Sequence, residues 1–102
     1  MSDGHKHDQE KPRMSLVFDG FANALTEVAK VGTFGANKYS DNGWMTVPNA
    51  EERYRAAMLR HYFEQAREGG NQLDDEMQLP HLAAVAWNAL AILELRLRDN
   101  EH

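Results

Sequence analysis

The sequence contains no cysteine among its 102 residues, which excludes a disulfide framework and a cysteine-based zinc site. It also has no long apolar run. The most apolar stretch, residues 82–95, is interrupted by Asn88 and Glu94 and is too short to span a bilayer, so no membrane partner is expected. The first ten residues are too polar for a secretory signal peptide. We therefore expect a cytoplasmic location.

Positive charge is scarce: the sequence has 11 Lys and Arg residues and 16 Asp and Glu residues, which give a formal net charge of -5. A nucleic-acid polymer is therefore not an expected partner, since such binders normally present a basic surface. Binding of a single nucleotide is compatible with the negative net charge, because divalent ions can bridge acidic groups on protein and ligand. The hydrophobic fraction of 42% predicts a folded chain, but so short a chain buries only a modest core. We expect self-association to complete that core.

The chain is predicted to form one small all-α domain. Residues 1–14 are charged and lack periodicity, which predicts a flexible N-terminal arm. Residues 15–102 carry apolar residues at helical spacing and no convincing strand pattern. The first helix is expected to begin near Asp19, a favoured N-cap residue type. Its pattern weakens at two glycines but can extend to Tyr39, before a turn at residues 40–43.

Two further helices are expected to form a central antiparallel hairpin. The second helix is predicted to start at Asn49, because Glu52 follows in a capping-box pattern, and to stop at Gly69-Gly70. Pro80 suits the first position of the third helix, and an acidic loop at residues 71–79 separates the two. The third helix is apolar on more than one side, through Leu82, Val85, Ala86, Ala89, Leu90, Ile92, Leu93, Leu95 and Leu97. Its second side is predicted to be a subunit interface in a homodimer or homotetramer.

Candidate metal ligands lie on the second helix and in the acidic loop that follows it. His61 and Glu64 are three residues apart and share one helical face, where they could hold one ion or form a simple solvated pair. Asp74-Asp75-Glu76 offers the carboxylate oxygens that Mg²⁺ prefers. The simpler interpretation is that these three acids complement the dipole of the following helix.

Polar residues also interrupt the apolar third helix. His81 and Asn88 lie seven residues apart, two turns along one face. A buried Asn88 amide must find partners, so it either ties helices together or orients a ligand or water.

The segment 34–44 places Lys38, Tyr39 and Trp44 around a glycine-containing turn. Aromatic faces suit a purine base and lysine suits phosphate. Alternatively, the two aromatic residues simply cover the end of the bundle.

Several short motifs occur in an order that resembles the phage dATP/dGTP diphosphohydrolases, which belong to the MazG-like all-α NTP pyrophosphohydrolases. The resemblance covers residues 6–96. It is carried by Lys11-Pro12, Ser15-Leu16, Phe34-Gly35-Ala36, Lys38-Tyr39, Asn42, Trp44, Arg60-His61, Asp74, Glu76, Leu79-Pro80-His81-Leu82 and Trp87-Asn88. It implies a helical oligomer that needs Mg²⁺ or Mn²⁺ and cleaves a purine deoxynucleoside triphosphate, dGTP or dATP, into monophosphate and pyrophosphate. A phage-encoded member would act in the host cytoplasm.

One departure from the family pattern affects the metal ligands. The broader superfamily uses Glu-x-x-Glu and Glu-x-x-Asp on successive helices, whereas the matching positions here hold Met58…His61 and His81…Ala84. Either the ligands have moved to Glu64, Asp74 and Glu76, with Glu27 as a further candidate, or the superfamily pattern aligns with this sequence in another register.

The residues and the resemblance together predict a specific set of roles. The predicted metal ligands are Glu64, Asp74 and Glu76. The predicted catalytic residues are His61, Glu76, His81 and Asn88. The predicted substrate-binding residues are Lys38, Tyr39, Trp44 and Arg60. The alternative function is a non-catalytic helical module that binds a nucleotide or another protein.

Overall fold

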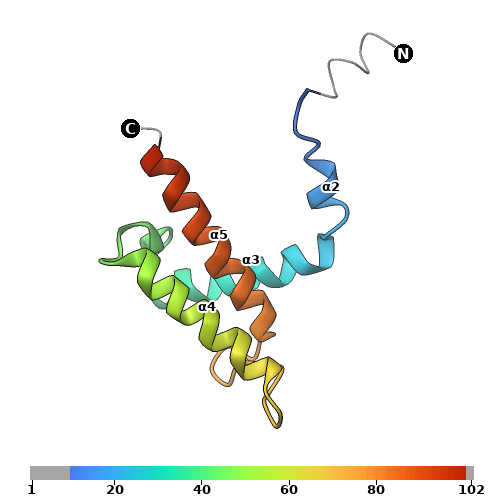
Figure 1. Cartoon of the computed structure of the whole chain (residues 1–102), viewed down its shortest axis with the longest axis vertical. Coiled ribbons are helices and arrows are strands. Elements are labelled where there is room, and N and C mark those ends of the chain that lie inside the picture. Colours follow the sequence, from blue (N-terminus) through green and yellow to red (C-terminus); the bar gives the residue numbers. More distant parts are fainter. Residues whose placement is uncertain (1–9, 101–102) are drawn as a thin grey trace.

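The computed structural model describes residues 10–100, and within this range it contains helices and no strand (Figure 1). The prediction of an all-α fold is confirmed. Residues 1–9 of the predicted N-terminal arm lie outside the described residues. The elements in chain order are α2 (Ser15–Phe18), α3 (Ala22–Lys38), the 3-10 turn η1 (Gly43–Thr46), α4 (Ala50–Ala66) and α5 (His81–Asn100).

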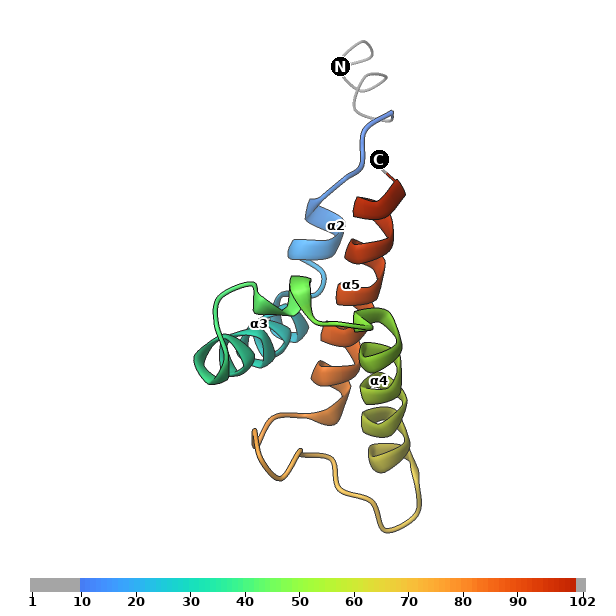
Figure 2. The same ribbon diagram turned by 90° about the vertical axis from the view of Figure 1, so that its left-hand side faces the viewer.

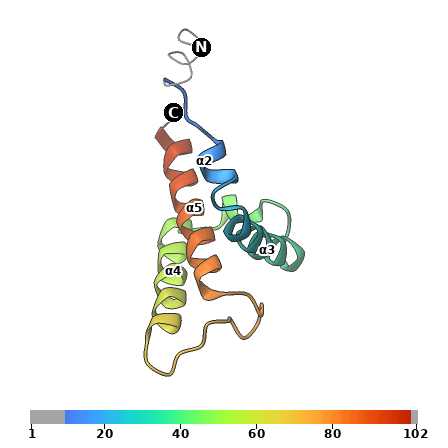
Figure 3. The ribbon, with the colours of Figure 1, turned by 90° about the vertical axis from the view of Figure 1, so that its right-hand side faces the viewer.

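The centre of the fold is the antiparallel hairpin of α4 and α5, which lie side by side in all three views (Figures 1, 2 and 3). The predicted hairpin is therefore confirmed. Helix α3 crosses α5 and projects from the hairpin (Figure 2). The crossing is close at Gly32, because a Cβ atom there would lie 3.2 Å from the Trp87 indole nitrogen. Helix α2 packs on α3 and stands away from α4.

One of the two predicted helix starts is wrong, and the other is confirmed. Asp19 does not cap the long first helix, because it ends the short helix α2, and α3 begins only after Phe21. Asn49 is the N-cap residue of α4, as predicted, but its backbone is left-handed (φ 54°, ψ 41°) and its side chain makes no capping bond. Glu52 and the neighbouring Glu51 nevertheless lie in the first turn of α4, where they complement the helix dipole.

The two faces of α5 differ in side-chain size and burial. The face towards α3 and α4 holds small or polar residues at three- and four-residue spacing, and all are buried: His81, Ala84, Asn88 and Ala91. The other face, which we call the leucine face, consists of Leu82, Leu90, Leu93 and Leu97, each about half exposed. Periodicity predicted two apolar sides, and the structure shows that the leucines lie on the uncovered one.

The buried hydrophobic core of the described chain is small. It comprises only Val31 and the three alanines Ala83, Ala84 and Ala91. The radius of gyration is 16.6 Å, whereas a compact domain of about 100 residues has a value of roughly 13 Å. Self-association remains a prediction, and this uncovered apolar surface supports it. None of the described helices is long and apolar enough to cross a membrane.

Candidate functional site

The loop between α4 and α5 folds back on itself and brings Asp74 beside the start of α5. Leu73 and Pro80 form an isolated antiparallel bridge, and the Asp74 amide donates to the Leu79 carbonyl at 2.8 Å. The His81 amide donates to the Gln72 carbonyl, also at 2.8 Å. These main-chain bonds fix the loop, so that Asp74 and His81, seven residues apart in sequence, reach the same point in space.

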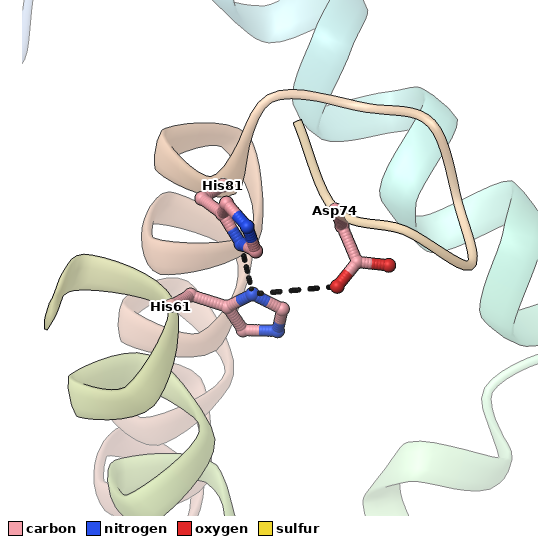
Figure 4. A group of neighbouring side chains, drawn as sticks. All are labelled: His61, Asp74 and His81. Atoms are coloured by element: carbon pink, nitrogen blue, oxygen red, sulfur yellow. Dashed lines mark hydrogen bonds and ion pairs between the residues drawn. The ribbon is translucent and has the colours of Figure 1, made fainter. Parts of the chain in front are cut away.

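At that point His61 of α4 meets His81 of α5 and Asp74 of the loop (Figure 4). The two histidine Nδ1 atoms lie 2.8 Å apart, and Asp74 Oδ1 lies 3.9 Å from His61 Nδ1. His81 is buried, while His61 and Asp74 are partly buried. All three ligand atoms lie within 4.8 Å of one another. Two imidazoles and a carboxylate gathered in this way could hold one metal ion, and we call these three residues the histidine–aspartate cluster.

The carboxylate of Asp74 is oriented by the main chain. Its Oδ2 atom accepts hydrogen bonds from the backbone amides of Glu76, at 3.0 Å, and Met77, at 2.9 Å. Its Oδ1 atom is the one directed at His61. One oxygen is therefore committed to the loop, and the other remains available to an ion.

Burial is the main influence on the protonation of His61. It lowers the pKa of the imidazole, and the nearby His81 and Arg60 lower it further, while Asp74 opposes the shift. The fold therefore favours neutral His61. Neutral imidazole is the form that ligates a metal ion.

A cavity of about 400 Å³ opens beside the cluster and carries both signs of charge. Arg60, a predicted substrate-binding residue, lines it together with Arg67. Glu64 also lines it, but both Glu64 oxygens accept bonds from Arg67, at 2.9 and 3.1 Å, and one also accepts from the Asn71 amide. The bonds from Arg67 hold the pKa of Glu64 below its usual value. Glu64 is thus an ion-pair partner at the cavity wall and is not a member of the cluster.

Glu76, predicted as a catalytic residue and metal ligand, and Lys38, predicted to bind substrate, pair with each other. Lys38 Nζ lies 2.9 Å from Glu76 Oε2, and the hydrogen bond from Glu76 raises the pKa of Lys38. The Glu76 side chain is 62% exposed. Neither residue lines the charged cavity, so this pair links the end of α3 to the acidic loop. Glu27 pairs with Lys30 along α3 and also lies outside the cavity.

A second, larger hollow of about 900 Å³ lies between α3, η1 and α5. It is lined by the predicted residues Tyr39, Trp44 and Asn88, and also by Trp87. The Trp44 and Trp87 rings meet edge to face with centroids 5.8 Å apart. His61 lines both this hollow and the charged cavity, so the two spaces meet at the cluster.

Asn88 faces this second hollow from the buried side of α5. Its Nδ2 atom donates to the Ala84 carbonyl at 2.7 Å, within the same helix. Among the described residues it makes no side-chain bond to another helix. The interpretation that Asn88 ties helices together therefore has no support from these contacts.

Two residues at the site were not singled out from the sequence. Tyr54 donates to the Trp44 carbonyl at 2.6 Å and packs edge-on against Trp87, so it fixes the aromatic wall. Arg67 neutralises Glu64. The three-residue spacing from Glu64 to Arg67 on one helix is a signal that could have identified that pair.

No curated protein and no solved structure matches the chain. A family model described as "dATP/dGTP diphosphohydrolase, N-terminal" matches residues 1–102, which is the whole sequence. The chain therefore belongs to the dATP/dGTP diphosphohydrolase N-terminal family.

Proposed function

We propose that the protein is a metal-dependent hydrolase that converts a purine deoxynucleoside triphosphate, dGTP or dATP, into monophosphate and pyrophosphate. The observation that carries the proposal is the position of His61. It belongs to the histidine–aspartate cluster and also lines both the charged cavity and the aromatic hollow. A nucleotide lying across the two spaces would place its phosphates beside the cluster.

The two spaces suit the two ends of a nucleotide. The hollow is lined by the aromatic side chains of Trp44 and Trp87 and by Asn88, residue types that suit a purine base. The cavity offers Arg60 and Arg67, whose guanidinium groups suit phosphate oxygens. The family assignment supports this substrate class.

Three residues would hold the ion: His61, Asp74 and His81. When bound, a divalent ion such as Mg²⁺ or Mn²⁺ neutralises phosphate charge and lowers the pKa of water. Asp74 keeps its free oxygen directed at the histidines because the loop amides hold the other one. Arg60 would orient the phosphates, and little covalent help is needed from the protein in phosphoryl chemistry.

The test is a panel of ribo- and deoxynucleoside triphosphates incubated with Mg²⁺ or Mn²⁺, with both products identified. We expect nucleoside monophosphate and pyrophosphate in equal amounts, with purine deoxynucleotides preferred. Excess chelator should abolish turnover while the helical circular dichroism spectrum persists. Release of inorganic phosphate in place of pyrophosphate, or full turnover with chelator, would contradict the proposal.

The leucine face supports a second candidate, a non-catalytic module that binds a nucleotide or another protein. Four half-exposed leucines along one helix form the kind of surface that a partner covers. Thermal stabilisation by nucleotide and metal without any product would favour this candidate.

A further inference from the structure

We infer that the histidine–aspartate cluster selects a first-row transition-metal ion, of the Mn²⁺, Co²⁺ or Zn²⁺ class, over Mg²⁺. The inference deepens the proposed function and rests on it only for the use of the ion in hydrolysis. The selection itself follows from the chemistry of the three ligands.

The donor set contains more nitrogen than oxygen. His61 and His81 each contribute an imidazole nitrogen, and Asp74 contributes one carboxylate oxygen. Imidazole suits transition-metal ions, whereas Mg²⁺ prefers oxygen ligands and sheds its water reluctantly. A site with two histidines therefore discriminates against Mg²⁺ through the identity of its donors.

The spacing of the donor atoms matches a small ion. Metal–ligand distances of about 2.0–2.2 Å place neighbouring ligand atoms roughly 3 Å apart. The two Nδ1 atoms are separated by 2.8 Å. Asp74 Oδ1 lies 3.9 Å from His61 Nδ1, so a small shift of the side chain would complete the set.

Two nearby carboxylates that could help to build an oxygen site, those of Glu64 and Glu76, are engaged elsewhere. Arg67 binds both oxygens of Glu64, and Lys38 binds Glu76. Asp75 lines the charged cavity but lies outside the cluster. The described residues therefore gather one carboxylate with two imidazoles, and not several carboxylates.

The test is direct metal binding without nucleotide. Three other histidines in the chain, His5, His7 and His102, could bind transition metals themselves. The measurement is therefore made on the full chain with all three replaced by glutamine. Calorimetry should show one Co²⁺ or Zn²⁺ ion per chain, bound at least 100-fold more tightly than Mg²⁺. Electron paramagnetic resonance of bound Mn²⁺ should show coupling to two histidine nitrogens.

Substitutions locate the site. His61→Ala and His81→Ala should each weaken Co²⁺ binding at least tenfold, and Glu76→Gln should leave it unchanged. Glu51→Gln serves as a control, because Glu51 lies in the first turn of α4, outside the cluster, and pairs with Arg96 of α5. The spectroscopic measurement does not depend on His61→Ala or His81→Ala, so it tests whether histidine binds the metal even if these variants fail to fold.

Two outcomes would overturn the inference. One is Mg²⁺ binding as tight as that of Co²⁺, lost in Glu76→Gln and retained in His61→Ala. The other is bound Mn²⁺ without nitrogen coupling. If the inference is overturned in this way but pyrophosphate is still released with Mg²⁺ bound elsewhere, the proposed function stands. Conversely, selective Co²⁺ binding without any hydrolysis would reject the function and keep the metal site.

Discussion

The two faces of α5 show an inverted distribution of side chains. The inner face buries a histidine and an asparagine among alanines, while the outer face exposes four leucines. Large apolar residues usually lie inside and polar residues outside. The small residues on the inner face leave room for the charged cavity and the aromatic hollow. The comparison suggests that one face serves chemistry and that the other is incomplete without a partner.

The largest expected effect tests the chemical role of the inner face. Asp74→Asn removes the only charged ligand of the cluster while keeping the shape of the side chain. Turnover should fall at least about 100-fold, because a bound ion supplies several kcal/mol of charge stabilisation. The measurement is kcat from pyrophosphate release, with a circular dichroism spectrum of the same sample. Asp99→Asn, the same change at an exposed position of α5, is the matched control. A wild-type kcat in Asp74→Asn would mean that the ion is held elsewhere.

The next effect tests the outer face. The wild-type protein should be at least dimeric at micromolar concentration, and Leu93→Glu should weaken the association by about 10- to 100-fold. Losing one buried leucine costs about 1.5–3 kcal/mol, and the new charge must also be desolvated. Sedimentation should then show more of the 11.6 kDa monomer. The neighbouring Glu94→Gln should not change the distribution, because Glu94 is exposed and pairs with Arg98. If the wild-type protein is a compact monomer, the leucine face is not a self-association surface.

A smaller effect is expected where η1 meets the inner face. Trp44→Ala should weaken nucleotide binding by roughly 1–3 kcal/mol, the range for stacking of a base on an aromatic ring. Trp44 is half-buried against Trp87, so the melting temperature should be measured alongside affinity. Met45→Ala is the control, because Met45 lies on the same short helix but does not line the hollow. Unchanged affinity in a folded Trp44→Ala protein would assign the tryptophan a structural role.

The smallest effect concerns Asn88. Its side-chain bond stays within α5, so Asn88→Ala should lower the free energy of unfolding by at most about 1.5 kcal/mol. If the amide contacts the nucleotide, affinity or turnover should fall by about two- to tenfold. Asn23→Ala, at an exposed position of α3, should change neither quantity. A large loss of stability with unchanged affinity would instead make Asn88 a structural residue of the inner face.

The fold could be predicted largely from local sequence patterns. The 3.6-residue period and the Gly69-Gly70 stop predict the α4–α5 hairpin, although α4 ends slightly earlier, at Ala66. The seven-residue spacing predicts that His81 and Asn88 share a face, and both are buried there. The start of α4 at Asn49 was predicted correctly, but the missing side-chain capping bond could not be, because that bond depends on the backbone angles of Asn49.

The arrangement of the site was less accessible to sequence reasoning, because it depends on contacts between distant residues. Asp74 was predicted as a ligand, but its meeting with His61 requires the loop to fold back. Sequence reasoning proposed Glu64 and Glu76 as metal ligands together with Asp74, since all three offer carboxylate oxygens. The structure distinguishes them by their partners, Arg67 and Lys38.

The hydrogen bonds to Asp74 Oδ2 restrict which sequences this loop can accept. The donors are the main-chain N–H groups of residues 76 and 77, and any residue except proline supplies such a group. Side chains at these two positions can therefore vary without disturbing the aspartate, whereas a proline at either would remove a donor. At positions 76 and 77 we therefore expect proline to be poorly tolerated, whereas a change in side-chain charge should leave the orientation of Asp74 unchanged.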